Sequence, residues 1–296
     1  MKKILSLGLA ALMTVFALTG CGADKGTDSK NSGAGTGTDT ISVLTREEGS
    51  GTRGAFIELT GVEEKTADGK KVDNTTADAE IANKTDVVLT SVAGNEKAIG
   101  YISLGALNDT VKAVKVDGAE ATVDNVKAGA YKLSRPFNIA TKGEPTGVAK
   151  DFISFILSKE GQAVVTDNKY IAVNDAAESF VSDGSSGQIA VGGSSSVSPV
   201  MEKLIEAYKS VNPNASIDLQ TSDSTSGMTG AMDGTFAIGM ASRELKDEEA
   251  AQLTGTAIAL DGIAVIVNPA NTIDELSMDQ IKSIYVGDIT DWGDLA

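Results

Sequence analysis

The sequence has no histidine, a single cysteine and few aromatic residues among its 296 positions. Without histidine there can be no Ser-His-Asp triad, no Cys-His dyad and no imidazole ligand for a metal. One cysteine cannot form an intramolecular disulfide, a thiolate zinc site or a CxxC redox pair. The 7 Phe, 5 Tyr and 1 Trp offer little for a base-stacking platform. We therefore expect no catalytic residues, no cofactor and no metal.

Positive charge is also scarce, because 25 Lys and Arg face 41 Asp and Glu, which gives a net charge of −16. Nucleic-acid phosphates require a basic face, so the sequence argues against a nucleic-acid partner. The sequence does have the composition of a folded protein, with 41% hydrophobic and 22% charged residues. Its length is near the upper limit for a single core, which favours two lobes.

The N-terminus explains the one cysteine. Two lysines after Met1 precede an apolar run, Ile4 to Leu18, which is short for a membrane span and typical of a secretory signal. The run ends in Leu-Thr-Gly before Cys21, which resembles a bacterial lipoprotein signal. That resemblance implies a signal peptide at 1–20 and lipidation of Cys21; the alternative is an ordinary signal peptide with a chance cysteine.

Residues 21–40 are rich in Gly, Ser, Thr and Asp and show no apolar periodicity. This composition is typical of a flexible leash. We expect a body held at the outer face of the cell membrane by its lipid, and the very acidic sequence favours a Gram-positive cell.

The body alternates short apolar runs with helical patterns, which predicts an α/β fold with mostly parallel strands. A polar stretch at 174–187 is interpreted as an internal linker. Strands are predicted at Ile41–Thr45, Ala98–Ser103, Gln188–Val191 and Ile258–Val267, and helices at Val148–Gly161, Pro199–Val211 and Met278–Ile284.

Three turns rich in serine and glycine, at 45–53, 193–199 and 221–228, each lie where a strand is followed by a helix. The first N–H groups of a helix have no partner within it, and the dipole is positive there, so such turns can bind an oxyanion. Arg46 could add a bidentate contact. A single turn of this kind is more often only a helix cap.

The first turn also matches a dinucleotide-binding pattern at Gly49, Gly51 and Gly54, but the helix that follows ends at Gly61. A dinucleotide-binding unit needs a full helix and then a parallel strand. We therefore reject this interpretation.

Taken together, the turns and their neighbouring segments resemble the phosphate-binding lipoproteins of bacterial ABC phosphate importers. The matching segments are Arg46–Phe56, Ala98–Leu107, Tyr131–Phe137, Asp151–Gln162, Gly193–Pro199, Ser224–Gly227, Ile238–Arg243, Ala259–Pro269 and Ile281–Trp292. The resemblance implies the type II periplasmic-binding-protein fold, in which two α/β lobes close on the ligand. It also implies a solute-binding protein that is not an enzyme and that delivers inorganic phosphate to an ABC permease.

The segments occur in a rotated order, which indicates a circular permutation with 174–187 joining the former ends. The lobe at 136–260 should then be continuous, and the other should be split between 41–135 and 261–296. The crossings near 134–136 and 260–262 are the expected hinge. We expect a monomer; the alternative is a chain that completes its lobes by exchange with a second copy.

The resemblance assigns phosphate contacts to Arg46, Ser50, Gly51, Thr52, Ser194, Ser195, Ser196 and Ser224. Arg243 also matches the family, but a structural ion pair would explain it equally well. The family often has an aspartate, a proton acceptor for phosphate, at the position of Ala237, so Glu48 or Asp223 would have to replace it. This gap leaves two alternatives open: a binder of another tetrahedral oxyanion such as sulfate, and a surface or signalling protein without a transport role.

Overall fold

The structure is a computed structural model, and it describes residues 39–295. The predicted signal peptide, Cys21 and nearly all of the predicted leash lie outside the described residues. Within the part of the chain that is described, no helix is both long and apolar enough to cross a bilayer.

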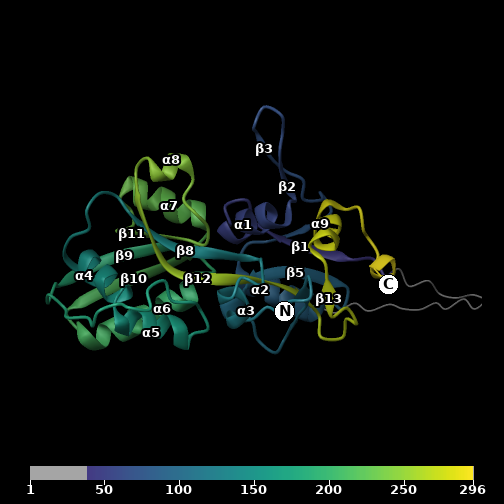
Figure 1. Cartoon of the computed structure of the whole chain (residues 1–296). Coiled ribbons are helices and arrows are strands. Elements are labelled where there is room, and N and C mark those ends of the chain that lie inside the picture. Colours follow the sequence, from purple (N-terminus) through teal and green to yellow (C-terminus); the bar gives the residue numbers. More distant parts are fainter. Residues whose placement is uncertain (1–38, 296) are drawn as a thin grey trace, which may run out of the picture. The chain divides into compact units, whose positions relative to one another are not determined.

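Helices and strands alternate along the chain (Figure 1). The elements before residue 130 are β1 (Ser42–Arg46), α1 (Gly51–Thr60), β2 (Glu63–Lys65), β3 (Lys71–Asp73), β4 (Glu80–Ala82), α2 (Thr85–Gly94), β5 (Ala98–Ser103), η1 (Leu104–Ala106), β6 (Lys112–Ala113), β7 (Lys115–Val116) and α3 (Val123–Lys127). They are followed by β8 (Ser134–Thr141), α4 (Gly147–Ile156), α5 (Lys159–Asp167), β9 (Gly187–Ser194), α6 (Ser198–Val211), β10 (Ala215–Ser222), α7 (Ser224–Asp233), β11 (Ile238–Ala241), α8 (Asp247–Ala250), β12 (Thr254–Val267), β13 (Glu275–Leu276), α9 (Met278–Val286) and η2 (Trp292–Leu295).

The prediction of one helix over Val148–Gly161 was wrong, because the structure has two helices there. α4 ends at Ile156, and Ser158 caps the new helix α5 by accepting a hydrogen bond from the Gly161 N–H at 3.2 Å. Serine competes well for this role because its side-chain oxygen satisfies an N–H that has no partner within the helix.

The prediction of mostly parallel strands was only partly right. The main sheet has the order β10-β9-β11-β8-β12-β5-β1-β4, and β9, β10 and β11 are parallel, as are β1, β4 and β5. Between these two parallel sets, β8 and β12 pair antiparallel with each other and with their neighbours. Within the sheet formed by residues 39–295, β8 and β12 are the strands that connect the two sets, so their pairing helps to position one set relative to the other.

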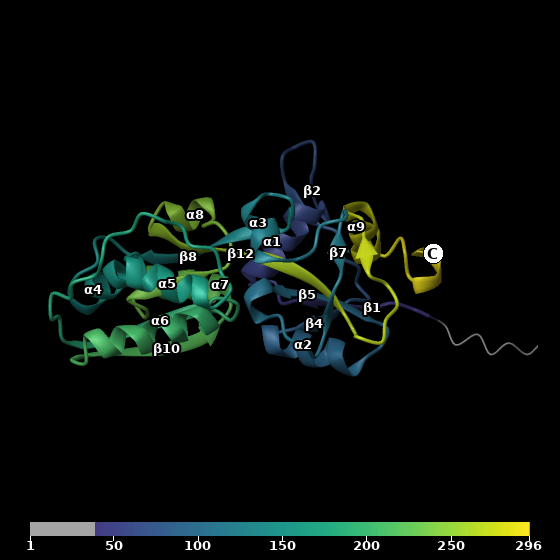
Figure 2. The same cartoon turned by 60° about the horizontal axis from the view of Figure 1, so that its bottom comes forward.

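The buried apolar residues separate into clusters on either side of this strand pair. One cluster takes its residues from 41–133 and 263–292, together with Ile171. The other clusters take theirs from 137–259. The change occurs where Arg135 of β8 is paired in register with Asp261 of β12, at the positions where the hinge is expected. Strands β9, β10 and β11 are covered on one face by α4, α5 and α6 (Figure 2). Their other face is covered by α7, whose Met228 and Ala231 pack against β8 and β11.

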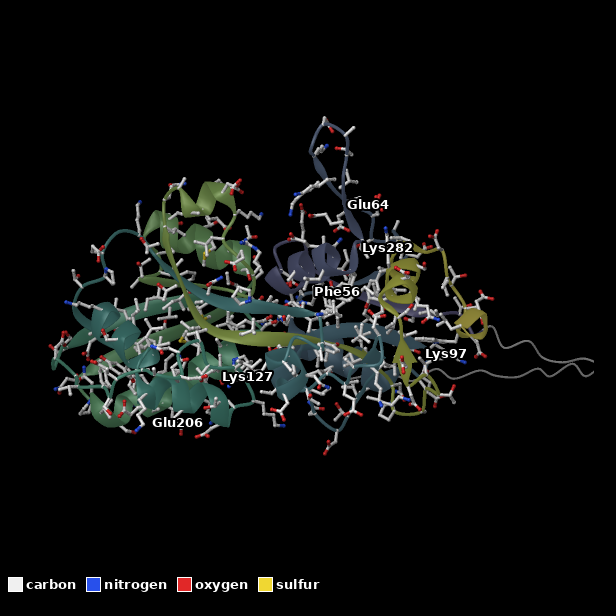
Figure 3. All side chains as sticks on the ribbon, viewed as in Figure 1. Phe56, Glu64, Lys97, Lys127, Glu206 and Lys282 are labelled. Atoms are coloured by element: carbon white, nitrogen blue, oxygen red, sulfur yellow. The ribbon has the colours of Figure 1, made fainter. Side chains whose placement is uncertain are left out.

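An aromatic stack in the first cluster holds the end of β1. Phe56 is fully buried and stacks on Tyr101 with 3.9 Å between ring centroids. Figure 3 shows Phe56 inside the fold, while the charged side chains of Lys127 and Glu206 lie at its periphery. The Tyr101 hydroxyl accepts a hydrogen bond from the Arg46 backbone N–H at 3.1 Å and contacts Thr45 Oγ1 at 2.8 Å. The core therefore fixes the backbone from which the Arg46 side chain starts.

The polar segment 174–187, interpreted above as a linker, is anchored to the helices of its own chain. The buried carboxylate of Asp151 in α4 accepts hydrogen bonds from the Ser182 hydroxyl at 2.8 Å and from the Asp183 N–H at 2.9 Å. Phe180 packs edge-on against Phe155, with 5.3 Å between ring centroids. The segment is thus held at specific positions although its composition is that of a loop.

Candidate functional site

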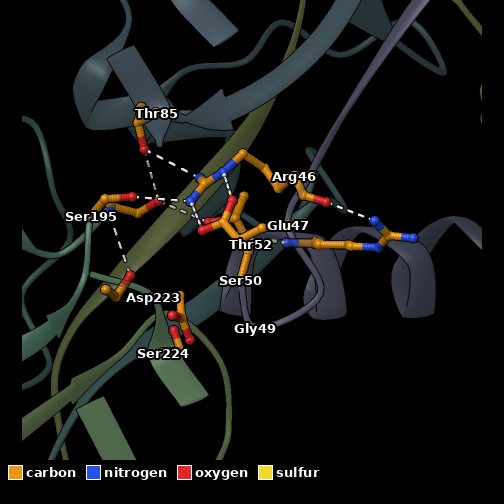
Figure 4. Close-up of polar contacts among 12 residues, drawn as sticks. Arg46, Glu47, Gly49, Ser50, Thr52, Thr85, Ser195, Asp223 and Ser224 are labelled. Carbon is orange, nitrogen blue, oxygen red and sulfur yellow. Dashed lines mark hydrogen bonds and ion pairs between the residues drawn. The ribbon is translucent and has the colours of Figure 1, made fainter. Parts of the chain in front are cut away.

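The three serine- and glycine-rich turns meet at one place, which Figure 4 shows in close-up. Strands β1, β9 and β10 each end at one of the turns, and α1, α6 and α7 begin there. A carboxyl end of a strand followed by the start of a helix brings free backbone N–H groups to the same edge of a sheet. The fold thereby places the predicted turns together, although 149 positions of sequence separate Arg46 in the first turn from Ser195 in the second.

Arg46 is a buried cation at the site, with 2% of its side chain exposed. Its guanidinium donates from Nε and Nη2 to both carboxylate oxygens of Glu47, at 2.8 and 2.7 Å. Nη2 also donates to Ser195 Oγ at 3.0 Å, and Nη1 donates to Thr85 Oγ1 at 3.4 Å (Figure 4). Arg46 therefore links the end of β1 to the turn after β9.

Hydroxyl groups from both parts of the fold form a buried cluster beside Arg46, which we call the hydroxyl cluster and define as Thr52, Ser194, Ser196, Ser224 and Ser242. Thr52 Oγ1 lies 2.8 Å from Ser196 Oγ and 3.3 Å from Ser242 Oγ. Ser242 Oγ also accepts from Ser194 Oγ at 3.0 Å and lies 3.4 Å from Ser224 Oγ. These hydroxyls now bond to one another, and each can rotate to donate to an anion instead.

The backbone of the first turn packs tightly against the third. Ser50 caps α1 by accepting a hydrogen bond from the Arg53 N–H at 3.3 Å. A Cβ atom at Gly51 would overlap Ser224 Oγ, so only glycine fits between these two helix ends. The Thr225 N–H donates to the Gly49 carbonyl at 3.1 Å, which joins the two turns directly. The site residues predicted in these turns (Arg46, Ser50, Gly51, Thr52, Ser194, Ser195, Ser196 and Ser224) thus lie together.

Neither of the two carboxylates considered as proton acceptors forms a hydrogen bond with the hydroxyl cluster among the described residues, although Asp223 lies beside Ser224 (Figure 4). Glu48 is exposed. Asp223 is occupied as the cap of α7, where it accepts from the Ser226 N–H at 2.9 Å and from the Ser226 hydroxyl at 2.6 Å. The carboxylate that does contact a site residue is that of Glu47, one residue away from the predicted position. Its partner Arg46 orients it into the site, which the spacing of the motif did not indicate.

The expectation about Ala237 was wrong. Ala237 is exposed and precedes β11, whereas the hydroxyl cluster begins after the other end of that strand, at Ser242. Ser242 follows Ala237 by five positions, which in extended chain is roughly 16 Å at 3.3 Å per residue. A carboxylate at 237 would not reach the cluster, so its absence says nothing about selectivity.

Arg243 is held in an ion pair outside the hydroxyl cluster. Its Nη1 and Nη2 donate to the two oxygens of Glu249 at 2.7 and 2.8 Å, and Nη2 donates to Thr225 Oγ1 at 3.3 Å. The hydrogen bonds from Arg243 and the Lys246 backbone outweigh the effect of burial and lower the pKa of Glu249. In the structure, Arg243 thus forms the structural ion pair that was considered as the alternative to a phosphate contact.

Sequence reasoning missed four residues that contact the site: Glu47, Thr85, Arg135 and Ser242. Ser242 stands directly before Arg243 in a segment already matched to the family, so its position was available. Arg135 was noted only as part of a crossing between lobes, yet its Nη2 donates to Thr52 Oγ1 at 3.0 Å. Its place at the site depends on the pairing of β8 with β12, which local sequence does not reveal.

The chemistry of the arrangement is that of a set of donors for an anion. Guanidinium groups only donate, and hydroxyls beside them can donate their own hydrogen. Among residues 39–295, no group of three His, Cys, Asp or Glu side chains is placed to hold a metal ion.

Comparisons with known proteins point to one family. The sequence model described as PBP superfamily domain matches residues 3–160 and 179–296. The chain is 50% identical to phosphate-binding protein PstS 2 of Streptococcus agalactiae over 297 residues, which cover 100% of this chain and 98% of the relative. It is 48% identical to phosphate-binding protein PstS 2 of Streptococcus pneumoniae over 291 residues, or 98% of each chain.

A solved structure agrees with the sequence comparisons. The crystal structure of a phosphate-binding protein of a phosphate ABC transporter from Streptococcus pneumoniae matches with a TM-score of 0.70 and 49% identity, and covers 87% of this chain and 100% of that one. The chain therefore belongs to the PBP superfamily and, within it, to the family of the phosphate-binding proteins PstS.

Proposed function

We propose that this protein captures inorganic phosphate between its two lobes and delivers it to an ABC importer. The observation that carries the proposal is the convergence of the hydroxyl cluster, Ser195 and Arg46 at the starts of helices from both parts of the fold. We further propose that the protein acts as a carrier without catalysis, outside the cytoplasm, attached to the membrane through a lipid on Cys21 and without a nucleic-acid partner. The 48–50% sequence identity to the PstS 2 proteins over nearly the full length supports this role.

The physical basis is the number of donors that a small dianion would meet. Hydrogen bonds to a charged group are worth about 1.5–3 kcal/mol each. Several such bonds, together with the buried Arg46 charge, can hold the anion against the net charge of −16. Closing the lobes removes the site from water, which strengthens each of these contacts.

Isothermal titration calorimetry with phosphate and with sulfate tests the proposal. We expect the protein to bind phosphate more tightly than sulfate, and Arg46→Gln to weaken phosphate binding by at least about a hundredfold, because two charged hydrogen bonds are lost. Arg243→Gln is the matched control, since it also removes an arginine from a bidentate carboxylate pair, and it should bind as the wild type does. No heat with phosphate, or normal binding by Arg46→Gln, would refute the assignment.

Another tetrahedral oxyanion, such as sulfate, is the second candidate. It is favoured by the positions of Glu48 and Asp223, neither of which is directed at the hydroxyl cluster. A protonated phosphate needs an acceptor, and Glu47 is the carboxylate beside Arg46. If Glu47 discriminates between the two anions, then Glu47→Gln should bring their affinities closer together. A protein that binds neither anion would instead have kept the fold for a surface or signalling role.

We propose the same lobe boundaries as before: 41–135 with 261–296, and 136–260 with its linker at 174–187. The division of the buried clusters at the Arg135–Asp261 pairing supports these boundaries. Contacts of the linker with α4 of its own chain support a circularly permuted monomer over an exchanged dimer. Gel filtration with light scattering distinguishes the two, because an obligate dimer would favour exchange.

A further inference from the structure

Arg135 lies at the point where the two parts of the fold join, and it contacts both. Its Nη2 donates to Thr52 Oγ1 at 3.0 Å in the lobe formed by 41–135 and 261–296. Its Nε donates to the Ser242 carbonyl at 2.9 Å in the lobe formed by 136–260. Its Nη1 donates to the Gly262 carbonyl at 3.3 Å and pairs with Asp261 at 2.8 Å. All three nitrogens of one buried side chain are thus used, and two of them contact site residues in different lobes.

The contact with Thr52 determines which way its hydroxyl can act. A guanidinium only donates, so Thr52 Oγ1 must accept from Arg135, and its own hydrogen is left to be donated. Donation from a cation also polarises the hydroxyl and strengthens that second hydrogen bond. Arg46 acts in the same way on Ser195, whose Oγ accepts from Arg46 Nη2. In each lobe, one hydroxyl (Thr52 or Ser195) therefore accepts a hydrogen bond from an arginine, which leaves its own hydrogen free to be donated.

The surroundings of Arg135 fix its position at the hinge. Asp261 stands opposite Arg135 in the β8–β12 register, and its Oδ1 accepts from the Gly105 N–H at 3.4 Å. The Tyr170 ring lies so close to Gly105 that a Cβ atom there would overlap it. Arg135 is therefore held from the hinge strands, while the two groups that it contacts belong to separate lobes.

We propose that Arg135 is a positioning residue for the bound anion: it orients the Thr52 hydroxyl as a donor, and its bond to the Ser242 carbonyl holds the guanidinium in place for this contact. The proposal rests on the function proposed above. Arg135 does not itself have to contact the anion. Its effect passes through Thr52, and this separates the proposal from a purely structural ion pair at the hinge.

A double-mutant cycle tests this coupling. Phosphate affinity is measured by calorimetry for the wild type, Arg135→Gln, Thr52→Val and the double variant, at a temperature at which circular dichroism shows each to be folded. We expect Arg135→Gln and Thr52→Val each to weaken binding by about ten- to a hundredfold, and the double variant to be at most about threefold weaker than the poorer single variant. Non-additivity of this size is expected because the two side chains act as one unit.

Two further variants protect the test against loss of folding. Arg135→Lys keeps the charge but has one donor group in place of a fork, so it should bind more weakly than the wild type and more tightly than Arg135→Gln. Asp151→Asn is the stability control, because Asp151 is a buried carboxylate of the linker anchor and contacts none of the site residues. It should lower thermal stability and leave the phosphate affinity unchanged.

Normal affinity in folded Arg135→Gln, or additive effects of the two single substitutions, would overturn the proposal and leave Arg135 as a structural residue. The wild-type titration alone tests the proposed function. If the wild type binds sulfate and not phosphate, the phosphate assignment fails and the cycle measured with sulfate still decides the role of Arg135. If the wild type binds neither anion, both proposals fail.

Discussion

Two buried aspartates, one at the hinge and one at the linker anchor, have pKa values that are shifted in opposite directions. Asp261 and Asp151 are only 1% and 3% exposed. Burial raises the pKa of Asp261 to about 6, although the charge of Arg135 opposes the shift. Burial also acts to raise the pKa of Asp151, but hydrogen bonds from the Asp183 N–H and from the Tyr208, Ser182 and Asn212 side chains outweigh it, so the pKa is lowered.

The difference lies in the donors around each carboxylate. Asp151 accepts from four groups within the described residues, including Tyr208 at 2.7 Å and Asn212 at 3.2 Å. Asp261 has its ion pair with Arg135 at 2.8 Å and one long hydrogen bond from Gly105. Hydrogen bonds to the charged form compensate for lost hydration, whereas one ion pair does not fully do so. The linker is thus fixed by a buried charge with several hydrogen-bond donors, whereas the buried charge at the hinge has few.

Removing the linker carboxylate should have the largest effect. We expect Asp151→Ala to lower the free energy of unfolding by about 3–5 kcal/mol, because buried Tyr208 and Asn212 lose a charged acceptor worth about 1.5–3 kcal/mol to each. Urea unfolding followed by circular dichroism measures the loss. Asp175→Ala is the matched control, since Asp175 is an exposed linker residue paired with Lys127, and surface pairs contribute about 0–1 kcal/mol. Equal losses in the two variants would show that the anchor does not stabilise the fold.

The two aspartates should also give opposite dependences of stability on pH. The pKa of Asp261 is higher in the folded state than the unfolded value of about 3.9, so its contribution is fully present below pH 4 and is lost as the pH rises through about 6. The difference in free energy of unfolding between the wild type and Asp261→Asn should therefore fall by about 2 kcal/mol between pH 4 and pH 7.

For Asp151 the sign is reversed, since its folded pKa lies below the unfolded one. The difference between the wild type and Asp151→Asn should be constant above about pH 5 and shrink as the pH falls below 4. Urea unfolding at a series of pH values measures both differences, and the other titrating groups cancel within each pair. Parallel curves for the two pairs would contradict the contrast between hinge and linker.

Local sequence was sufficient for the parts of the site that lie where a strand is followed by a helix. Thr52, Ser196 and Ser224 each follow a strand and begin or precede a helix, so their turn patterns were enough to predict that they lie close together. The same local reasoning described Arg46, which leaves the end of β1. The α/β class followed from alternating patterns in the same way.

Residues that depend on long-range pairing could not be found in this way. Arg135 donates to the Ser242 carbonyl across 107 positions of sequence, because β8 pairs with β11 and β12 in one particular register. The choice between Glu47 and Glu48 depends on a turn that directs one of two adjacent carboxylates to Arg46. The error at Ala237 had the same cause, since a motif shows that a strand is present without showing which of its ends faces the site.

The smallest effect should distinguish two buried tyrosines. The Tyr208 hydroxyl donates to Asp151 at 2.7 Å, whereas the Tyr170 hydroxyl, near the hinge, has no hydrogen-bond partner among residues 39–295. We expect Tyr208→Phe to lower the free energy of unfolding by about 1–2 kcal/mol and Tyr170→Phe to change it by less than about 0.5 kcal/mol or to raise it, because only the first loses a charged hydrogen bond. Urea unfolding of the two variants gives the comparison. Each substitution keeps the ring, so packing is matched, and equal losses would mean that the hinge hydroxyl is as well paired as the one in the linker anchor.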